Sequence, residues 1–302
     1  MYEQIAANKR KSIFLILFFL VLIFALAWAF GQITDFGRYA IIPAAVLAVF
    51  MTWGSYYYSD RIALRVSRAR PVSKDEYPYL YNVVEGLAIA AGIPKPRCYV
   101  IDDTAPNAFA SGRNPENAVV VVTTGILEKL NRAELEGVIA HELSHIKNYD
   151  ILVQTLAVVM VGVIVLLSDW ILRTFLWGGG RRRRSSSEKG GGNAGAILVI
   201  VALALAVLSP LFAQLLRLAV SRKREFLADA DGAMLTRYPA GLASALRKLS
   251  ADTEPLEAAN KATAHMYIVN PLKGQKHGGG AMAKLFSTHP PIEERVAALE
   301  KM

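Results

Sequence analysis

Two histidines four positions apart flank a glutamate in the segment His-Glu-Leu-Ser-His, residues 141–145. On an α-helix this spacing places His141 and His145 on one face, where their imidazole nitrogens can bind a single metal ion. Glu142 is rotated by about 100° from His141, so its carboxylate lies beside the metal without having to ligate it. A carboxylate in that position can take a proton from a water activated at the metal. The pattern is typical of zinc-dependent proteases.

The residues around this segment predict the helix that the pattern needs. Apolar side chains recur at helical spacing at Leu135, Val138, Ile139, Leu143 and Ile146. Asn131, followed three residues later by Glu134, resembles a capped helix start. An HExxH pattern arises by chance in roughly one chain in a hundred of this length, so the alternative is a chance pair of surface histidines.

A second group of acids follows in the segment 221–233. Glu225 and Asp229 are four apart and face the same way on a helix. A catalytic zinc takes three protein ligands and keeps one position open for water, and two histidines with a glutamate form a standard set. Glu225 is therefore the predicted third ligand, and Asp229 is placed to accept the free N–H of a ligand histidine. The alternative for Glu225 is a solvated acid among basic neighbours.

The composition of the 302-residue chain indicates membrane segments. Its hydrophobic fraction is 53% and its mean hydropathy is +0.31, which is high for a water-soluble protein of this size. The formal net charge of +9 could reflect nucleic-acid binding, but the basic residues cluster beside apolar runs, which favours membrane topology. The one cysteine, Cys98, cannot form an internal disulfide, as fits a domain in a reducing cytosol.

Apolar runs of about the length of a bilayer-crossing helix occur at residues 12–30, 40–58, 151–177 and 194–216. Basic residues precede the first run and follow the second, so the ends of this first hairpin are expected in the cytoplasm. The competing interpretation of the first run is a cleavable signal peptide, because Ala25-Leu26-Ala27 has the form of a cleavage site. Against it, the apolar run continues past that point and a second run follows.

The third and fourth runs leave an alternative open. Residues 178–193 between them are rich in glycine and arginine and are predicted to be disordered. If all four runs span the membrane, Arg181–Arg184 lie outside, against the positive-inside rule. The alternative is a hairpin that dips into the bilayer without crossing it, or that packs on protein. We favour four spans and interpret the arginine run as a solvated loop rather than a nucleic-acid patch.

The sequence of the water-soluble part predicts a small sheet beside the helix that carries His141 and His145, called the metal helix below. An amphipathic pattern indicates a helix at residues 75–92, and β-rich patterns indicate strands at residues 97–101 and 118–123. A free edge of this sheet could pair with an extended substrate backbone, or it could be purely structural.

The expected fold class is α+β, mainly α, in an integral membrane protein with four hydrophobic helices and a cytosolic zincin-like catalytic domain containing a small β-sheet. Four parts are predicted along the chain. Residues 1–60 form a transmembrane hairpin, and residues 61–150 form a first catalytic part with the HExxH helix. Residues 151–216 form a second hydrophobic hairpin, and residues 217–302 form a second catalytic part with the Glu225 helix.

Near the other end of the chain, His289 precedes Pro290-Pro291, which hold the backbone extended ahead of a predicted helix at residues 292–299. A histidine held in this way can donate a hydrogen bond to charge that develops in a transition state. The alternative is a capping or surface histidine. His277 lies in a loop rich in glycine and lysine, and His265, on a half-apolar segment, could belong to the core or to a substrate cleft.

Three stretches together resemble the HtpX family of membrane-bound zinc endopeptidases: HELSH at 141–145, SRKREFLADADGA at 221–233 and FSTHPPIEER at 286–295. The same signatures are similar to those of the CaaX prenyl protease relatives and of the soluble gluzincins. The likeness covers nearly the whole chain, including the paired hydrophobic runs and the NAFASG stretch at 107–112.

The resemblance implies a role for each matching residue. One zinc ion per chain would be bound by His141, His145 and Glu225. Glu142 would be the general base, Asp229 would support a ligand, and His289 would stabilise the oxyanion. The implied substrate-binding residues are Asn107, Ala108, Phe109, Ala110 and Arg295, the last helping to hold substrate or site, with the strand up to Thr123 completing the edge.

The implied activity is endoproteolysis of misfolded or damaged membrane proteins, a quality-control role. The implied partners are polypeptide substrates and the lipid bilayer, without nucleic acid, and the implied location is the bacterial inner membrane with the catalytic domain facing the cytoplasm. Two other classes of function stay open on the sequence. One is a membrane scaffold with a structural zinc site, and the other is a basic nucleic-acid binder that depends on Arg181–Arg184.

Overall fold

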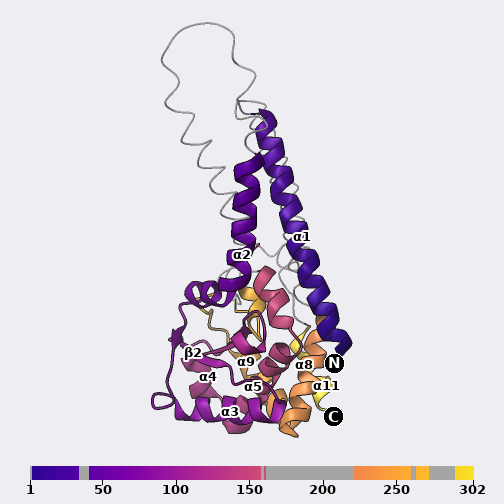
Figure 1. Ribbon diagram of the computed structural model, residues 1–302. Coiled ribbons are helices and arrows are strands. Elements are labelled where there is room, and N and C mark those ends of the chain that lie inside the picture. Colours follow the sequence, from indigo (N-terminus) through magenta and orange to yellow (C-terminus); the bar gives the residue numbers. More distant parts are fainter. Residues whose placement is uncertain (1, 34–40, 158–159, 161–220, 260–262, 272–289) are drawn as a thin grey trace.

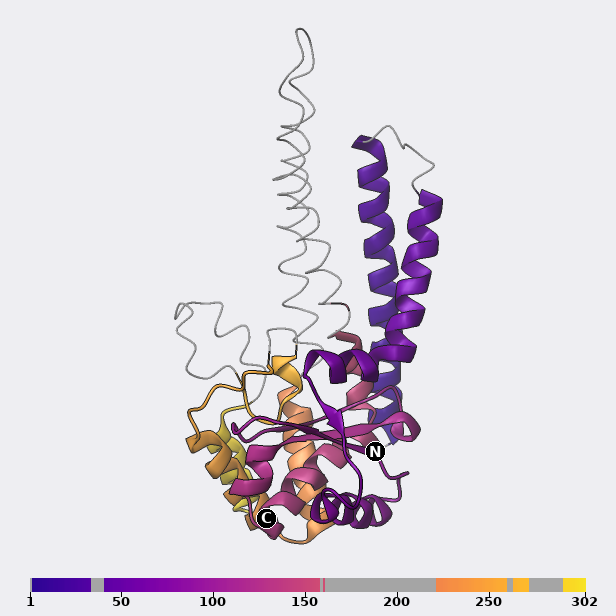
Figure 2. The same cartoon turned by 90° about the vertical axis from the view of Figure 1, so that its left-hand side faces the viewer.

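The computed structural model describes residues 2–33, 41–157, 160, 221–259, 263–271 and 290–302. Two long helices, α1 (Tyr2–Ile33) and α2 (Ile41–Val66), lie side by side and project from the rest of the described chain (Figure 1, Figure 2). The start of α1 lies against that body, near α8 (Figure 1). α2 continues past the expected end of the second apolar run at residue 58.

Among the described residues, none of the helices combines the length and the hydropathy that a bilayer crossing requires. Most of the third predicted span and the whole of the fourth lie outside the described residues, as does the arginine-rich stretch between them. The described part of the third run, up to Ala157, is helical from Asp150 onward.

A four-stranded mixed sheet lies beside the metal helix. Its strand order is β1-β2-β4-β3, with β2 and β4 parallel and the two outer pairs antiparallel. The strands are β1 (Arg70–Pro71), β2 (Arg97–Ile101), β3 (Ala108–Ser111) and β4 (Val119–Thr123). The predictions of β2 and β4 are confirmed, and β4 is buried along its whole length, as expected for a strand that is apolar on both faces. β1 and β3 were not predicted as strands.

Six more helices and two short turns complete the described part of the chain. They are α3 (Pro78–Ala91), α4 (Thr124–Lys129), α5 (Arg132–Lys147), α8 (Arg222–Thr236), α9 (Pro239–Ala251) and α11 (Ile292–Leu299), with short 3-10 turns η2 (Pro115–Asn117) and η3 (Ala264–Met266). α3, α4 and α5 contact the sheet, and α8 and α9 pack against α5. The predicted helices that correspond to α3, α5, α8 and α11 are confirmed. α5 is central, because it packs against α3, α8, α9 and β3.

α5 begins with the capping box that its sequence indicates. The side chain of Asn131 accepts from the N–H of Glu134 at 3.0 Å, and the Glu134 carboxylate accepts from the N–H of Asn131 at 2.8 Å. The same carboxylate also accepts from Ser244 and Lys248 of α9, at 2.6 and 2.7 Å. The cap therefore fixes both the start of the metal helix and its contact with α9.

Two glycines allow the neighbouring helices to approach α5 closely. A Cβ at Gly137 would lie 2.8 Å from the backbone nitrogen of Leu242 in α9, which is a clash. A Cβ at Gly232 of α8 would lie 3.1 Å from the backbone nitrogen of His141. Because α8 carries Glu225, the close contact at Gly232 brings the predicted third ligand to the two histidines.

Candidate metal centre

The side chains of His141, His145 and Glu225 converge at one point inside the protein. The histidines lie one turn apart on α5, and Glu225 lies in the first turn of α8 alongside. The Nε2 atoms of the histidines are 3.2 Å apart. The Glu225 carboxylate oxygens lie 3.8 Å from Nε2 of His141 and 3.5 Å from Nε2 of His145. All three side chains are buried.

These separations fit a tetrahedral metal ion. With metal–ligand bonds of about 2.0–2.1 Å, two corners of a tetrahedron lie about 3.3 Å apart. The Nδ1 atoms of both histidines face carboxylates. When both imidazoles are neutral and donate hydrogen there, their two Nε2 lone pairs point at the same place, where a metal ion can bind. Two imidazoles and one carboxylate form a zinc site with a fourth position open to water.

The His141 ring is held by an ion pair behind it. Nδ1 of His141 lies 2.9 Å from Asp229, one turn after Glu225 on α8. The guanidinium of Arg295, on α11, donates to both oxygens of Asp229 at 2.8 and 2.6 Å and to the carbonyl of Ile268 at 3.1 Å. Burial raises the pKa of Asp229, but the hydrogen bonds and charge of Arg295 outweigh it and lower the pKa overall. Burial lowers the pKa of His141, so the ring is neutral, as a metal ligand must be.

The second histidine has a carboxylate partner that the sequence analysis did not identify. Oδ2 of Asp150 lies 2.9 Å from Nδ1 of His145. Burial opposes protonation of His145, but the hydrogen bond to Asp150 and the charge of Glu225 outweigh it and raise the pKa of His145 to about 9. Binding of a metal ion at Nε2 therefore has to displace a proton from His145. The available signal was an acid just past the end of the metal helix. Its position directly before the third apolar run gives no sign of a role at the metal.

Glu142 lies beside the convergent ligands and is not one of them. Its carboxylate is 2% exposed and accepts a hydrogen bond from the backbone N–H of Ala110 in β3. Burial raises the pKa of Glu142 to about 7, with the charge of Glu225 adding to the rise and that of His145 opposing it. A buried carboxyl with this pKa can exchange a proton at neutral pH.

β3 is an edge strand whose outer side faces α5. The backbones of Asn107 and Thr123 are hydrogen-bonded at its start, so in the antiparallel ladder the backbone groups of Ala108 and Ala110 point away from β4. The carbonyl of Ala108 accepts from the N–H of Ile268 at 3.0 Å. The N–H of Ala110 reaches Glu142. The edge therefore passes directly in front of the candidate base.

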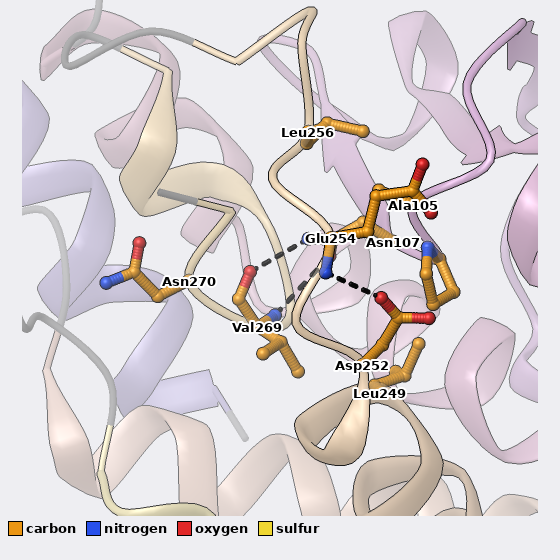
Figure 3. A pocket seen from close by; sticks show the side chains of 9 residues that line it. Ala105, Asn107, Leu249, Asp252, Glu254, Leu256, Val269 and Asn270 are labelled. Carbon is orange, nitrogen blue, oxygen red and sulfur yellow. Dashed lines mark hydrogen bonds between the residues drawn. The ribbon is translucent and has the colours of Figure 1, made fainter. Parts of the chain in front are cut away.

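Two other predicted substrate-binding residues, Asn107 and Phe109, make contacts within the chain. The Asn107 side chain donates to the carbonyl of Val269 at 2.9 Å and accepts from the N–H of Ala108 at 3.1 Å. Figure 3 shows the Asn107–Val269 contact at a pocket of about 10 Å³, which has room for one water. The Phe109 ring packs edge to face on Tyr267, with centroids 5.0 Å apart.

The predicted residue His289 lies outside the described residues, as does His277. Arg295 is 0% exposed, so the structure places it behind the metal position, where it contacts Asp229. His265 is buried, with Nε2 3.4 Å from the carbonyl of Gln154.

A buried site of two histidines and a glutamate, with a free glutamate next to it on the same helix, defines the class of zinc metalloproteases. The profile described as Peptidase family M48 matches residues 74–302. A protein named "Protease HtpX homolog" from Dictyoglomus thermophilum is 52% identical over 100% of this chain and 94% of its own length. One of the same name from Listeria monocytogenes serotype 4b is 45% identical over the full length of both chains.

A third relative with that name, from Thermoanaerobacter pseudethanolicus, is 44% identical over 100% of this chain and 98% of its own. The crystal structure of S. mikatae Ste24p superimposes with a TM-score of 0.49 at 20% identity, over 99% of this chain and 67% of that one. On the profile match and the HtpX relatives, the chain belongs to peptidase family M48 as a homologue of the HtpX proteases.

Proposed function

We propose that Glu142 is the general base of a peptidase reaction in which water attacks the peptide bond. Zinc bound by the two histidines and Glu225 would activate the water and polarise the scissile carbonyl. The Glu142 carboxylate would take the proton of the water and return it to the leaving amine. The observation that carries the proposal is the position of Glu142, a buried carboxylate that is not a ligand, with a pKa of about 7, beside the converging ligands.

The neighbouring residues are proposed to hold the reacting groups in place. Asp229 fixes the orientation of His141, supported by their 2.9 Å contact, and fully buried Arg295 acts through Asp229 rather than on substrate. For His289 the support is its place before Pro290-Pro291 in the sequence, together with the family resemblance. It is proposed to donate to the developing oxyanion, a contribution of about 3–4 kcal/mol in other enzymes.

We propose that an extended substrate pairs with the outer edge of β3. The support is the outward direction of the backbone of Ala108 and Ala110 and the contact of Ala110 with Glu142. Because the carbonyl of Ala108 is bonded to Ile268, pairing with substrate would begin at Ala110. Asn107 and Phe109 would then shape the edge through their contacts with Val269 and Tyr267.

Membrane integration is proposed from the outer faces of α1 and α2. Large apolar side chains that are more than half exposed follow both helices, at Ile13, Phe14, Leu17, Val21, Trp28, Ile42, Val46, Val49, Phe50 and Trp53. Exposed apolar surface of this extent needs an apolar medium or a partner. The basic residues at the start of α1 and the end of α2 support a cytoplasmic catalytic domain. The proposed substrates are misfolded or damaged membrane proteins.

Proteolysis by the purified full chain in detergent micelles tests the base assignment. Glu142→Gln is expected to keep one zinc per chain and to lower kcat at least about 1000-fold, since it removes the proton acceptor. Glu136→Gln, on the same helix and paired with Arg132, is the matched control and is expected to cleave at the parent rate. A Glu142→Gln variant that still cleaves would contradict the assignment. A parent protein with stoichiometric zinc and no cleavage would favour the structural-zinc alternative.

Membrane vesicles test the location and the substrate class separately. The chain is expected to stay with bacterial membranes after washing at high pH. Added trypsin is expected to cut the catalytic domain in inside-out vesicles and not in right-side-out ones. A heat-damaged membrane protein is expected to be cleaved faster than its folded form. Release of the chain by the wash, or equal cleavage of both substrate forms, would contradict the respective proposal.

A further inference from the structure

The first turns of α1 lie against the end of the metal helix. Asn8 is 3% exposed, and its Nδ2 atom donates to the carbonyl of Asn148 at 2.8 Å and to Oδ1 of Asp150 at 2.7 Å. Its Oδ1 atom accepts from Arg224 at 3.2 Å. Both ends of this one amide are therefore bonded to residues that are 140 to 216 positions away in the sequence.

The Asp150 carboxylate connects Asn8 to a zinc ligand. Its Oδ1 atom accepts from Asn8 at 2.7 Å and from Arg224 at 3.2 Å. Its Oδ2 atom lies 2.9 Å from Nδ1 of His145. Arg224 is adjacent in sequence to Glu225. One carboxylate thus joins α1, the end of α5 and the start of α8, the two helices that carry the ligands.

The turn that places Asp150 has a strained backbone. Tyr149 has a φ of 60°, a left-handed conformation that costs a residue with a side chain about 1–2 kcal/mol. The Lys9 ammonium lies 4.5 Å from the centre of the Tyr149 ring, and Asn8 holds the carbonyl of Asn148. Residues of α1 therefore contact the turn at Asn148 and Asp150, on either side of the strained residue.

We propose that α1 is a working part of the metal centre, in which Asn8 is a positioning residue that fixes the Asp150 carboxylate and, through it, the ring of His145. A ligand imidazole needs a fixed acceptor for its other nitrogen, and loss of such an acceptor typically costs about 10–100-fold in metal affinity. Without Asn8, Oδ1 of Asp150 keeps the Arg224 contact and the carboxylate can rotate away from His145. This inference concerns zinc binding and does not depend on the role of Glu142.

The test measures zinc binding by the full chain in detergent micelles, stripped of metal and titrated against a chromogenic chelator. Asn8→Ala is expected to raise the zinc dissociation constant about tenfold, and Asp150→Asn about 10–100-fold. In cobalt(II)-substituted protein both variants are expected to shift the visible absorption bands, which report ligand geometry. Ser12→Ala is the matched control, because Ser12 is equally buried and donates to the carbonyl of Asn8 within α1. It is expected to change neither readout.

Because Asn8 acts through Asp150, the two substitutions are expected not to add. The double variant Asn8→Ala/Asp150→Asn is expected to bind zinc within about twofold of Asp150→Asn alone. Unchanged zinc affinity in Asn8→Ala, or full additivity in the double variant, would overturn the proposal.

If the Asn8→Ala protein cannot be produced in folded form, a variant in which the side chains at positions 8 and 150 are exchanged tests the same proposal. In Asn8→Asp/Asp150→Asn the amide at position 150 can still accept from His145 and can donate to the carboxylate at position 8. The exchange variant is therefore expected to bind zinc at least about threefold more tightly than Asp150→Asn. Equal affinities would overturn the proposal, because they would mean that the pair at positions 8 and 150 does not position His145.

Discussion

At the scale of single residues, the largest fully buried side chain among the described residues is that of Arg295, a charged group in a region filled by hydrophobic ones. Its guanidinium makes a two-pronged contact with Asp229, and Asp229 in turn holds His141. Two buried charges of this kind depend on each other, because either one alone has no water to solvate it. The stability of the protein and the orientation of the ligand therefore depend on the same ion pair.

Arg295→Met is expected to lower the free energy of unfolding by about 3–5 kcal/mol, because it leaves the buried Asp229 charge without its main partner. Urea unfolding of the chelator-treated protein measures this without a contribution from zinc. Arg247→Met is the control, since the ion pair of Arg247 with Glu300 is half-exposed and is worth less than about 1 kcal/mol. Similar losses in the two variants would contradict the structural role of Arg295.

The ligands were predictable from the sequence, because their spacing alone places His141 and His145 on one face of a helix. A catalytic zinc site needs a third protein ligand, and Glu225 is an acid suited to that place. The supporting contacts were not predictable. Asp150 reaches His145 only because a left-handed residue turns the chain back. Asn8 meets that turn from 142 positions away, and no local pattern encodes such a contact.

At the scale of elements, the start of α5 shows how one cap can stabilise two helices. Burial raises the pKa of Glu134, but hydrogen bonds from Lys248, Ser244 and the N–H of Asn131 outweigh it and lower the pKa overall. A folded-state pKa below the unfolded one adds stability above the unfolded pKa of about 4.3. That stability is lost as the pH falls through the folded-state pKa.

Glu134→Gln is therefore expected to unfold at lower urea concentration than the parent at pH 7. The difference between them is expected to shrink as the pH is lowered below about 4, where the parent carboxylate also becomes protonated. The urea concentrations at half-unfolding, measured between pH 7 and pH 3, give this difference in stability. Glu136→Gln, also on α5, is the control. A difference that stays constant with pH would show that the carboxylate charge is not what stabilises the cap.

Close helix packing gives a second prediction at this scale. Gly137→Ala is expected to destabilise the protein by about 1–3 kcal/mol, because its Cβ meets the backbone of Leu242 in α9. Gly86→Ala, in the middle of α3 with nothing within 4 Å of the added Cβ, is the matched control and is expected to stabilise by about 0.5–1 kcal/mol. The melting temperatures of the two variants, each compared with the parent, measure these effects. Equal changes in melting temperature would mean that α5 and α9 do not pack as closely as the backbone contact at Gly137 requires.

The sheet was only half predictable, for a physical reason. The runs that form β2 and β4 contain β-branched and apolar residues and indicate strands by themselves. The sequence of β3, Ala-Phe-Ala-Ser, has little preference for a strand. It is extended because β4 pairs with one side of it and Ile268 with the other. The strand beside the candidate base is thus defined by its tertiary neighbours.

At the scale of the whole molecule, the residues that would bind zinc lie on helices that are far apart in the chain. The histidines are on α5 and the glutamate is on α8, while α1 and α11 hold the supporting groups. An ion that binds the folded state and not the unfolded one stabilises by about 2.7 kcal/mol when its free concentration is 100 times the dissociation constant. The metal site is therefore expected to contribute to the stability of the whole catalytic domain.

Chelation is expected to lower the melting temperature of the parent protein, and added zinc to restore it. Glu225→Ala lacks a ligand and is expected to show no response to either treatment at the same zinc concentration. Differential scanning calorimetry measures both. A parent protein that melts at the same temperature with and without zinc would contradict the predicted link between metal binding and stability.

The position of Arg295 in the chain has a consequence for synthesis. The HExxH residues leave the ribosome first, but the guanidinium that fixes Asp229 against His141 is translated 154 residues later, which takes roughly 8–30 s at ordinary elongation rates. A partly made chain then holds histidines that cannot yet be oriented for metal. We therefore expect a chain still in synthesis to lack an ordered metal site, and with it peptidase activity, until Arg295 has been added and can contact Asp229.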